Sequence, residues 1–540
     1  MLQFTRLGFF NEHVYRFLIT FTVAATLLGC TQKTVVPPPA GEFADKPSMP
    51  PLRALSQGSR LAPVFGPPQE YDGSPLDEVG RQGLFGVHRP KLNQIALLKN
   101  GDESFAARLQ LLEAAEKSIR IQALIFWGDE SGLYIAEILK KKKAEGIDVR
   151  VIVDAAANLG LQTQWMYFDL KQHGIEVQGY ESLYLEWINE LPIPFLSPAK
   201  DPEAPNHRYH EKLWIVDGET DRKSAVVGGL NIANEYFRVN PSDPDHFWRD
   251  QDIIVKGSIV ADMVTAFDRN FNHFLEIKES RGALNTDLYW ESTRKLLDKF
   301  GKLTIPYTTR SDLVERVKTM AQMEPALHYV KAPSRFFHNR PRLGESYIRQ
   351  AYRKLLDHAE REIIICNAYF IPSADFIDAV RDAVSRGVRV IILTNSPETN
   401  DLPELTMVGR SYYKKILAIN EDAGTKKIGG SVQIWEWYGW RYDQAQQTEG
   451  TIHAKYAVFD RRYSLVGSYN LDPRSEKLNS ETAVVFESNI LSAKLAQMFF
   501  ENDLAYSRRV TPKEASGYNE PTDALYKLRK EFGGLFESLL

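Results

Sequence analysis

The stretches His210-Glu-Lys-Leu-Trp-Ile-Val-Asp217 and His453-Ala-Lys-Tyr-Ala-Val-Phe-Asp460 share one spacing of histidine, lysine and aspartate. The apolar residues at the centre of each stretch predict a β-strand, and the two-residue period of a strand places the histidine and the lysine on one face. Each aspartate then ends its strand at a turn. A single match of this spacing can occur by chance, whereas two matches in one chain indicate a shared function.

The two stretches belong to an internal repeat. Leu112-Glu-Ala-Ala-Glu-Lys-Ser-Ile119 is similar to Leu356-Asp-His-Ala-Glu-Arg-Glu-Ile363, and the offset between these copies is nearly that between His210 and His453. Periodicity predicts helix, strand, helix and strand in both copies, at 104–115, 119–126, around 135–139 and 149–153, and again at 351–359, 362–368, 376–385 and 388–393. The same order occurring twice predicts two α/β domains built on one plan.

A chain of 540 residues is too long for one ordinary core, in agreement with two domains. Prolines at 306, 325, 333 and 341 favour a linker between the halves. The predicted organisation is a lipoprotein signal peptide at 1–29, a Pro-rich tether at 30–85, a first domain at 86–300, a linker at 301–340 and a second domain at 341–540.

The N-terminal segment has the features of an export signal. Two arginines precede an apolar run at 17–28, which is shorter than the roughly 20 residues needed to span a bilayer. The run ends in Leu27-Leu-Gly-Cys30, which resembles the lipobox of bacterial lipoproteins and implies acylation of Cys30. We therefore expect a lipid anchor in the cell envelope, at the outer membrane facing the periplasm. An ordinary signal peptide or uncleaved anchor is the alternative.

Composition excludes several classes of function. The formal net charge of -4 gives no strongly basic balance, so no nucleic-acid partner is expected. The two cysteines provide neither a disulfide framework nor a metal cluster, and no metal or other cofactor is expected. Cys366 follows three isoleucines in a predicted strand, which indicates a buried core thiol.

The residues after each motif are small and polar. They read Val227-Gly-Gly-Leu-Asn231 after the first motif and Val466-Gly-Ser-Tyr-Asn470 after the second, which continues through Asp472, Arg474 and Ser475 to Glu481. With these residues the chain resembles the phospholipase D superfamily. The stretches 228–237 and 248–252 resemble its cardiolipin synthase-like bacterial members, and the resemblance extends from about Leu97 to Phe500.

The resemblance implies two pseudo-symmetric domains, each a mixed β-sheet flanked by helices, with one active site at their interface. It also implies phosphodiester transfer on phospholipids through a phosphohistidine, most simply phosphatidyl transfer of the cardiolipin synthase type. Hydrolysis to phosphatidic acid and an exported nuclease are the alternatives. A binding scaffold without activity would be marked by the loss of a motif histidine or lysine, and all four are present. We expect a monomer whose partners are phospholipid and the membrane surface.

Phosphodiester chemistry requires positive charge at the nonbridging oxygens and a nucleophile paired with an acid–base group. By family analogy His210 is the nucleophile and His453 the acid and base. Each needs an acidic partner, for which family spacing implies Glu481 beside His453 and Asp250, rather than Asp252, beside His210. The predicted catalytic residues are His210, Lys212, Asp217, His453, Lys455 and Asp460, and the supporting residues are Asn231, Asn470, Asp250, Glu481 and Ser468.

Two of these assignments have structural alternatives. Asp217 and Asp460 stand at strand ends, where turn formation explains them at least as well as chemistry does. Ser468 fits either an assisting role at the phosphate or a small packing residue.

Overall fold

The computed structural model describes residues 48–52, 91–154, 157–179, 208–280, 307–441 and 447–518. The predicted signal peptide, Cys30 and nearly all of the tether lie outside these ranges. Within them, no helix combines the length and the apolar character needed to cross a bilayer.

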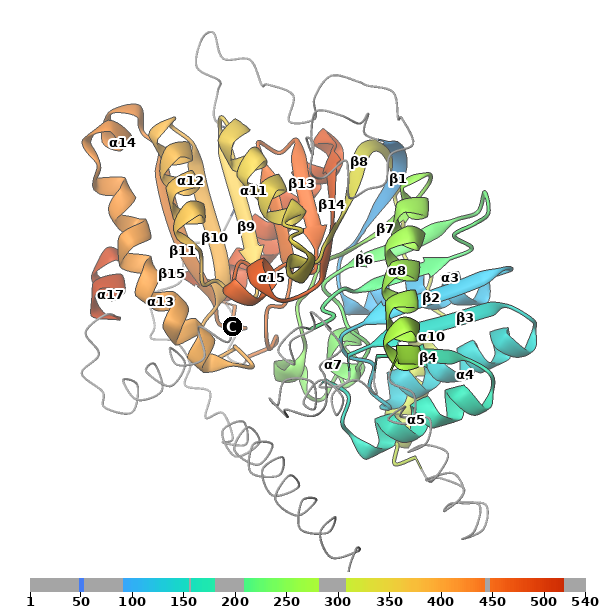
Figure 1. The fold of residues 1–540 in the computed structure, drawn as a ribbon. Helices are drawn as coiled ribbons and strands as arrows, with labels where there is room; N and C mark the ends of the chain where they lie inside the picture. The colour runs from blue at the N-terminus through green and yellow to red at the C-terminus, as the bar shows by residue number, and fades with distance from the viewer. Residues whose placement is uncertain are drawn as a thin grey trace, which may run out of the picture.

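The described strands form a single mixed sheet of 15 strands that runs through both halves of the chain (Figure 1). The strands of the first half are β1 (Lys91–Leu98), β2 (Ser118–Ala123), β3 (Asp148–Val153), β4 (Glu176–Gln178), β5 (Leu213–Val216), β6 (Ser224–Gly228) and β7 (Asp252–Lys256). Those of the second half are β8 (Val330–Asn339), β9 (Glu362–Asn367), β10 (Arg389–Asn395), β11 (Ser431–Trp437), β12 (Lys455–Phe459), β13 (Tyr463–Gly467), β14 (Glu481–Glu487) and β15 (Ser507–Arg509).

The order of the strands shows the duplication directly. From the centre outward, one half runs β1-β7-β6-β5-β2-β3-β4 and the other β8-β14-β13-β12-β9-β10-β11, followed by β15. The halves meet where β1 pairs antiparallel with β8, with Gln94 opposite Lys331. The expected pair of related α/β halves is therefore confirmed, and a pseudo-twofold axis passes between β1 and β8.

Helices cover both faces of the sheet, which gives three layers. The described helices of eight or more residues are α3 (Gly101–Glu113), α4 (Glu130–Ala144), α5 (Leu161–Gln172), α8 (Ile259–Ser280), α10 (Ser311–Ala321), α11 (Tyr347–His358), α12 (Ala374–Ser385), α13 (Pro403–Leu417) and α16 (Asn489–Met498). On one face α8 and α16 pack on strands of both halves and form one continuous core. On the other, α3, α4 and α5 cover the first half and α11, α12 and α13 cover the second.

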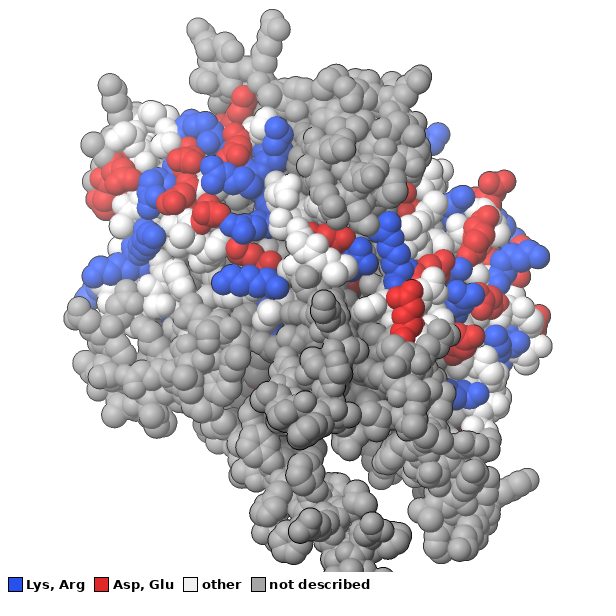
Figure 2. All heavy atoms as spheres, viewed as in Figure 1, with Lys and Arg blue, Asp and Glu red and all other residues white. Residues whose placement is uncertain are grey.

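The repeated sequence lies where a helix turns into the sheet. Leu112 to Ile119 spans the end of α3 and the start of β2, and Leu356 to Ile363 spans the end of α11 and the start of β9. Cys366 is buried in β9, as expected. On the described part of the face in Figure 2, basic and acidic side chains are interspersed.

The segment expected to be a linker contains regular structure. Residues 311–321 form α10, and residues 330–339 form β8, the strand at the centre of the sheet. Pro333 lies in β8 opposite Leu92 of β1, just beyond the last β14 pairing, between Ser334 and Phe486. A proline is tolerated there because the β14 side of the strand has no pairing partner at this residue.

Candidate active site

Both motif histidines lie at one edge of the sheet. His210 and Lys212 come directly before β5, and His453 comes directly before β12, which begins at Lys455. Because β5 and β12 run antiparallel to β2 and β9, these starts lie beside the carboxyl ends of the parallel strands. Both histidines are buried, and both lysines are fully so.

The backbone ties each histidine segment to the opposite half of the chain. The amide of His210 donates to the carbonyl oxygen of Ser480 at 3.0 Å, and that of Ser480 donates to Arg208 at 2.9 Å. The equivalent bonds in the other half run from His453 to Arg249 at 2.7 Å and from Arg249 to Thr451 at 2.8 Å. Ser480 and Arg249 thus each bind the backbone of the histidine segment in the other half.

The acidic partners cross between the halves in the same way. His210 Nδ1 lies 2.9 Å from Glu481 Oε1, and His453 Nδ1 lies 2.7 Å from Asp250 Oδ2. The predicted pairing was therefore wrong and is reversed. The strand order alone does not bring these partners together, because β5 and β14 lie far apart in the sheet. Isolated bridges between Tyr209 and Ser480 and between Arg249 and Ile452 place each acid beside the histidine of the other half. Asp252 instead pairs with Arg108 at 2.8 Å.

Each carboxylate is supported by further hydrogen bonds. Ser475 Oγ donates to Glu481 Oε1 at 2.7 Å, and Ser468 Oγ donates to Glu481 Oε2. The backbone amide of Gln251 donates to Asp250 at 2.7 Å. Ser468 therefore positions Glu481, a role that neither interpretation from the sequence had included. Burial raises the pKa of Glu481 to about 7 and raises that of Asp250.

The two lysines place positive charge between the histidines. Lys212 Nζ donates to the carbonyl oxygen of His210 at 2.6 Å, and Lys455 Nζ donates to that of His453. Burial lowers the pKa of Lys212 to about 7 and that of Lys455 to about 8. Burial and the two lysines lower the pKa of both histidines well below the usual value. The unliganded site thus combines neutral imidazoles with cations that an anion would stabilise.

A family comparison agrees with this geometry. The family described as "Cardiolipin synthase, PLD-like domain" matches residues 109–275 and 352–504, which is more than half of the chain. The chain belongs to this family. The predicted superfamily is confirmed, and the protein is an enzyme of the PLD-like class.

Individual relatives cover most of the chain. The major cardiolipin synthase ClsA of Bacillus subtilis is 27% identical over 423 residues, which is 78% of this chain and 71% of the relative. Cardiolipin synthase 1 of Bacillus anthracis is 26% identical over 460 residues, with 85% and 75% covered. The crystal structure of phosphatidylserine synthase from Haemophilus influenzae superposes with a TM-score of 0.57 at 18% identity, over 83% of this chain and 98% of the other. That match shows a shared fold.

The asparagines of the PLD-like site differ in their surroundings. Asn231 Nδ2 donates to Tyr236 Oη at 3.0 Å, and its Oδ1 accepts from the amide of Ile125. Asn470 Oδ1 is buried and has no hydrogen-bond partner among the described residues. The side chain of Asn231 thus holds its own loop, whereas the Oδ1 atom of Asn470 is left for a donor that the described residues do not supply.

Two aromatic residues of the site lie within the stretches 228–237 and 248–252, and they were assigned no role from the sequence. The rings of Trp248 and Tyr236 lie 4.9 and 5.5 Å from the imidazole of His453, both edge to face. His453 therefore packs against aromatic rings, whereas His210 lies beside Glu481, which two serines hold by hydrogen bonds. The two histidines thus have different surroundings. The signal that could have found Trp248 is its position two residues before Asp250.

Asp217 and Asp460 lie at the far ends of their strands, about 20 Å along the chain from the histidines. Asp217 accepts hydrogen bonds from the amides of Glu116, Lys117 and Ser118, and Asp460 accepts the equivalent three bonds from residues 360–362. Both have left-handed backbones, with φ of 52° and 53°. These contacts support the turn-forming role and place neither carboxylate at the reacting groups.

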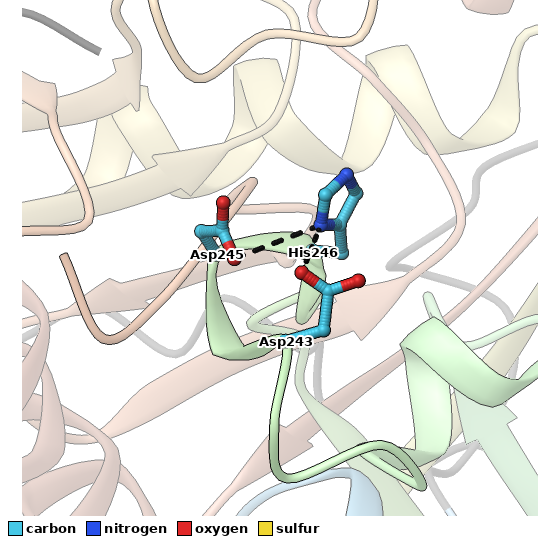
Figure 3. Close-up of side chains that lie close together, drawn as sticks. All are labelled: Asp243, Asp245 and His246. Atoms are coloured by element: carbon cyan, nitrogen blue, oxygen red, sulfur yellow. Dashed lines mark hydrogen bonds and ion pairs between the residues drawn. The ribbon is translucent and has the colours of Figure 1, made fainter. Parts of the chain in front are cut away.

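One exposed group among the described residues has metal-ligand chemistry. Asp243, Asp245 and His246 lie together around a short 3-10 turn (Figure 3), with His246 Nδ1 2.7 Å from Asp243 and 3.7 Å from Asp245. The ion pairs within the group account for its arrangement. None of the three is a predicted site residue.

Proposed function

We propose that this PLD-like enzyme transfers phosphatidyl groups between phospholipids through a phosphohistidine, as a cardiolipin synthase does. The observation that carries the proposal is the pair of buried histidines, each held at Nδ1 by a carboxylate of the opposite half and flanked by buried lysines. With Nδ1 engaged, each Nε2 is the nitrogen left to act on a substrate. The names of the relatives support phospholipid as the substrate.

In the first step, neutral His210 Nε2 attacks the phosphorus of a phosphatidylglycerol donor. A phosphorus–nitrogen bond forms, and the phosphorus–oxygen bond to the glycerol headgroup breaks. Protonated His453 gives its proton to the departing alkoxide, so that glycerol leaves. Lys212 and Lys455 neutralise the nonbridging oxygens, whose negative charge in turn favours protonated His453.

In the second step, neutral His453 removes a proton from the primary hydroxyl of a second phosphatidylglycerol. The resulting oxygen attacks phosphorus, the phosphorus–nitrogen bond breaks, and His210 is released neutral. The products are cardiolipin and a regenerated site. Glu481 stabilises the positive charge that the His210 ring carries while it is phosphorylated, and Asp250 does the same for His453.

The test is to incubate the protein with phosphatidylglycerol vesicles and to analyse the lipids by mass spectrometry. We expect cardiolipin and glycerol from the unaltered protein and neither from His210→Ala or His453→Ala. Phosphatidic acid in place of cardiolipin would make the enzyme a hydrolase. No histidine-dependent lipid product would contradict the proposal, and the same variants would then be assayed on nucleic acid.

We propose in addition that acylated Cys30 anchors the enzyme at the outer membrane, as the lipobox-like sequence implies. Growth with labelled palmitate tests this. We expect label on the unaltered protein in the outer-membrane fraction and none on Cys30→Ser, whereas equal label on both would contradict the anchor.

A further inference from the structure

A buried carboxylate lies between the histidine and the lysine of the first motif only. Glu211 stands between His210 and Lys212, and strand alternation turns its side chain to the opposite face of the sheet, toward α8. Its side chain is fully buried. The equivalent position in the second motif is Ala454.

The partners of Glu211 come from two other elements. Its Oε1 accepts a hydrogen bond from Asn270 Nδ2 of α8 at 3.0 Å and lies 3.0 Å from His338 Nε2 of β8. Its Oε2 is buried without a hydrogen-bond partner among the described residues. Burying a carboxylate costs free energy unless hydrogen bonds or an ion pair compensate for the loss of water. A role in the site would explain why the chain keeps a carboxylate here.

His338 belongs to the half of the chain opposite Glu211. It lies on β8 opposite Thr482 of β14, and the next residue, Asn339, lies opposite Glu481. The first histidine segment is therefore held twice from across the seam. Glu481 holds the ring of His210, and His338 holds the side chain of the adjacent residue.

The charge of Glu211 acts on the first motif. Burial opposes its ionisation, but the hydrogen bonds from His338 and Asn270 lower the pKa of Glu211 below its ordinary value. Its negative charge raises the pKa of both His210 and Lys212, against the larger effect of burial. The second motif has alanine at this place and so lacks any such charge.

We propose that Glu211 and His338 form a positioning pair that fixes the His210–Lys212 segment against the second half and supplies a permanent negative charge to it. This inference rests on the proposed function, because the charge would favour the positively charged phosphohistidine on His210 over one on His453. The pair thus distinguishes two motifs that are otherwise alike.

The experiment combines kinetics with a titration that needs no substrate. Glu211→Gln keeps the size and the hydrogen bond of the side chain but removes its charge. We expect kcat to fall about tenfold with little change in KM. In NMR titrations, with the His210 signal identified by its absence in His210→Asn, we expect the pKa of His210 to fall by about half a unit or more.

Variants of His338 test the pair from its other side. His338→Gln keeps a hydrogen-bond donor, so its kcat and its His210 titration should stay close to those of the unaltered protein. His338→Leu removes the donor and should behave like Glu211→Gln. All of these variants keep the other charged groups that act on His210. These are its hydrogen-bond partner Glu481 and the cations Lys212, Lys455 and Arg474.

The matched control is Glu436→Gln on β11. Glu436 is equally buried and pairs with Arg410 at 2.7 Å, and it is not among the groups with the largest effects on the pKa of His210. It should lose thermal stability and keep the His210 titration. An unchanged titration in both Glu211→Gln and His338→Leu, or an equal shift in Glu436→Gln, would overturn the inference. Because the titration requires no turnover, it decides the matter even if the protein forms no cardiolipin.

Discussion

At the scale of single residues, the site depends on which acid holds which histidine. Asp250 and Glu481 occupy equivalent places in the two halves. Each lies two residues before the residue that pairs with the glycine that follows its motif, which is Asp252 opposite Gly228 and Ala483 opposite Gly467. Each also holds the histidine of the other half. A histidine without its carboxylate loses both its orientation and the stabilisation of its charged form.

We therefore expect Asp250→Asn and Glu481→Gln each to lower kcat by a factor on the order of 10⁴, as loss of the acid does in other histidine sites. Asp252→Asn is the control, because Asp252 is equally buried but pairs with Arg108. It should lower the melting temperature and leave kcat of the folded enzyme within about threefold of the original. Steady-state kinetics on phosphatidylglycerol vesicles measure all three, and a kcat loss for Asp252→Asn equal to that for Asp250→Asn would contradict the assignment.

The lysines give the site a pH-dependent affinity for anions. With a pKa of about 7 for Lys212 and about 8 for Lys455, both lysines are mostly charged at pH 6 and mostly neutral at pH 9. Sulfate keeps a constant charge over this range. Its inhibition constant at fixed ionic strength should rise at least tenfold between pH 6.5 and 9. A constant value would show that the lysines keep their protons.

At the scale of elements, Asp217 and Asp460 join the turn after β5 or β12 to the start of β2 or β9. Each carboxylate accepts the amides of three consecutive residues, and each backbone is left-handed. Sequence spacing had made them candidates for catalysis because they belong to the same motif as the histidines. Their contacts indicate that the histidine and lysine of each motif belong to the active site, whereas the aspartate stabilises a turn.

We expect Asp217→Ala and Asp460→Ala each to lower the free energy of unfolding by about 2–4 kcal/mol, because three amides, one of them buried and the others partly buried, lose a charged acceptor. Asn keeps one acceptor oxygen and tolerates the left-handed backbone, so the Asn variants should lose less than half as much. Urea unfolding gives these values. If instead the Ala variants fold with unchanged stability but lose activity, the catalytic assignment is correct.

The sequence predicted much of the fold because the signals were local. Helix and strand periodicity, and the repeat at 112–119 and 356–363, lie within short windows. The site residues were also predictable by type, since the motifs name them. Their pairing was not, because His453 and Asp250 are 203 residues apart and His210 and Glu481 are 271 apart. Contacts between segments at the ends of distant strands leave no local signal in the sequence, and Pro333 argued against a strand where β8 lies.

At the scale of the whole molecule, the two halves form one catalytic unit. They share one sheet and one core, and each supplies the acid for the other's histidine. Neither half contains a complete histidine–acid pair in the described structure. A monomer therefore has one site, and both histidines in it must come from the same chain.

Mixing His210→Ala with His453→Ala should consequently restore no activity, even after the two proteins are unfolded and refolded together. Cardiolipin formation measures the outcome, and the unaltered protein treated in the same way is the control for refolding. Restored activity would show that halves exchange between chains, as in a domain-swapped dimer.

The central place of β1 also affects how the protein folds as it leaves the ribosome. β1 is the first described strand to be made, yet its partner β8 ends 241 residues later, counted from Leu98 to Asn339. Until then β1 is an edge strand of the first half's sheet with one side unpaired, which is a template for pairing with other chains. An exported chain held unfolded until translocation is complete would avoid that exposure, because both halves would then be present when the sheet first forms.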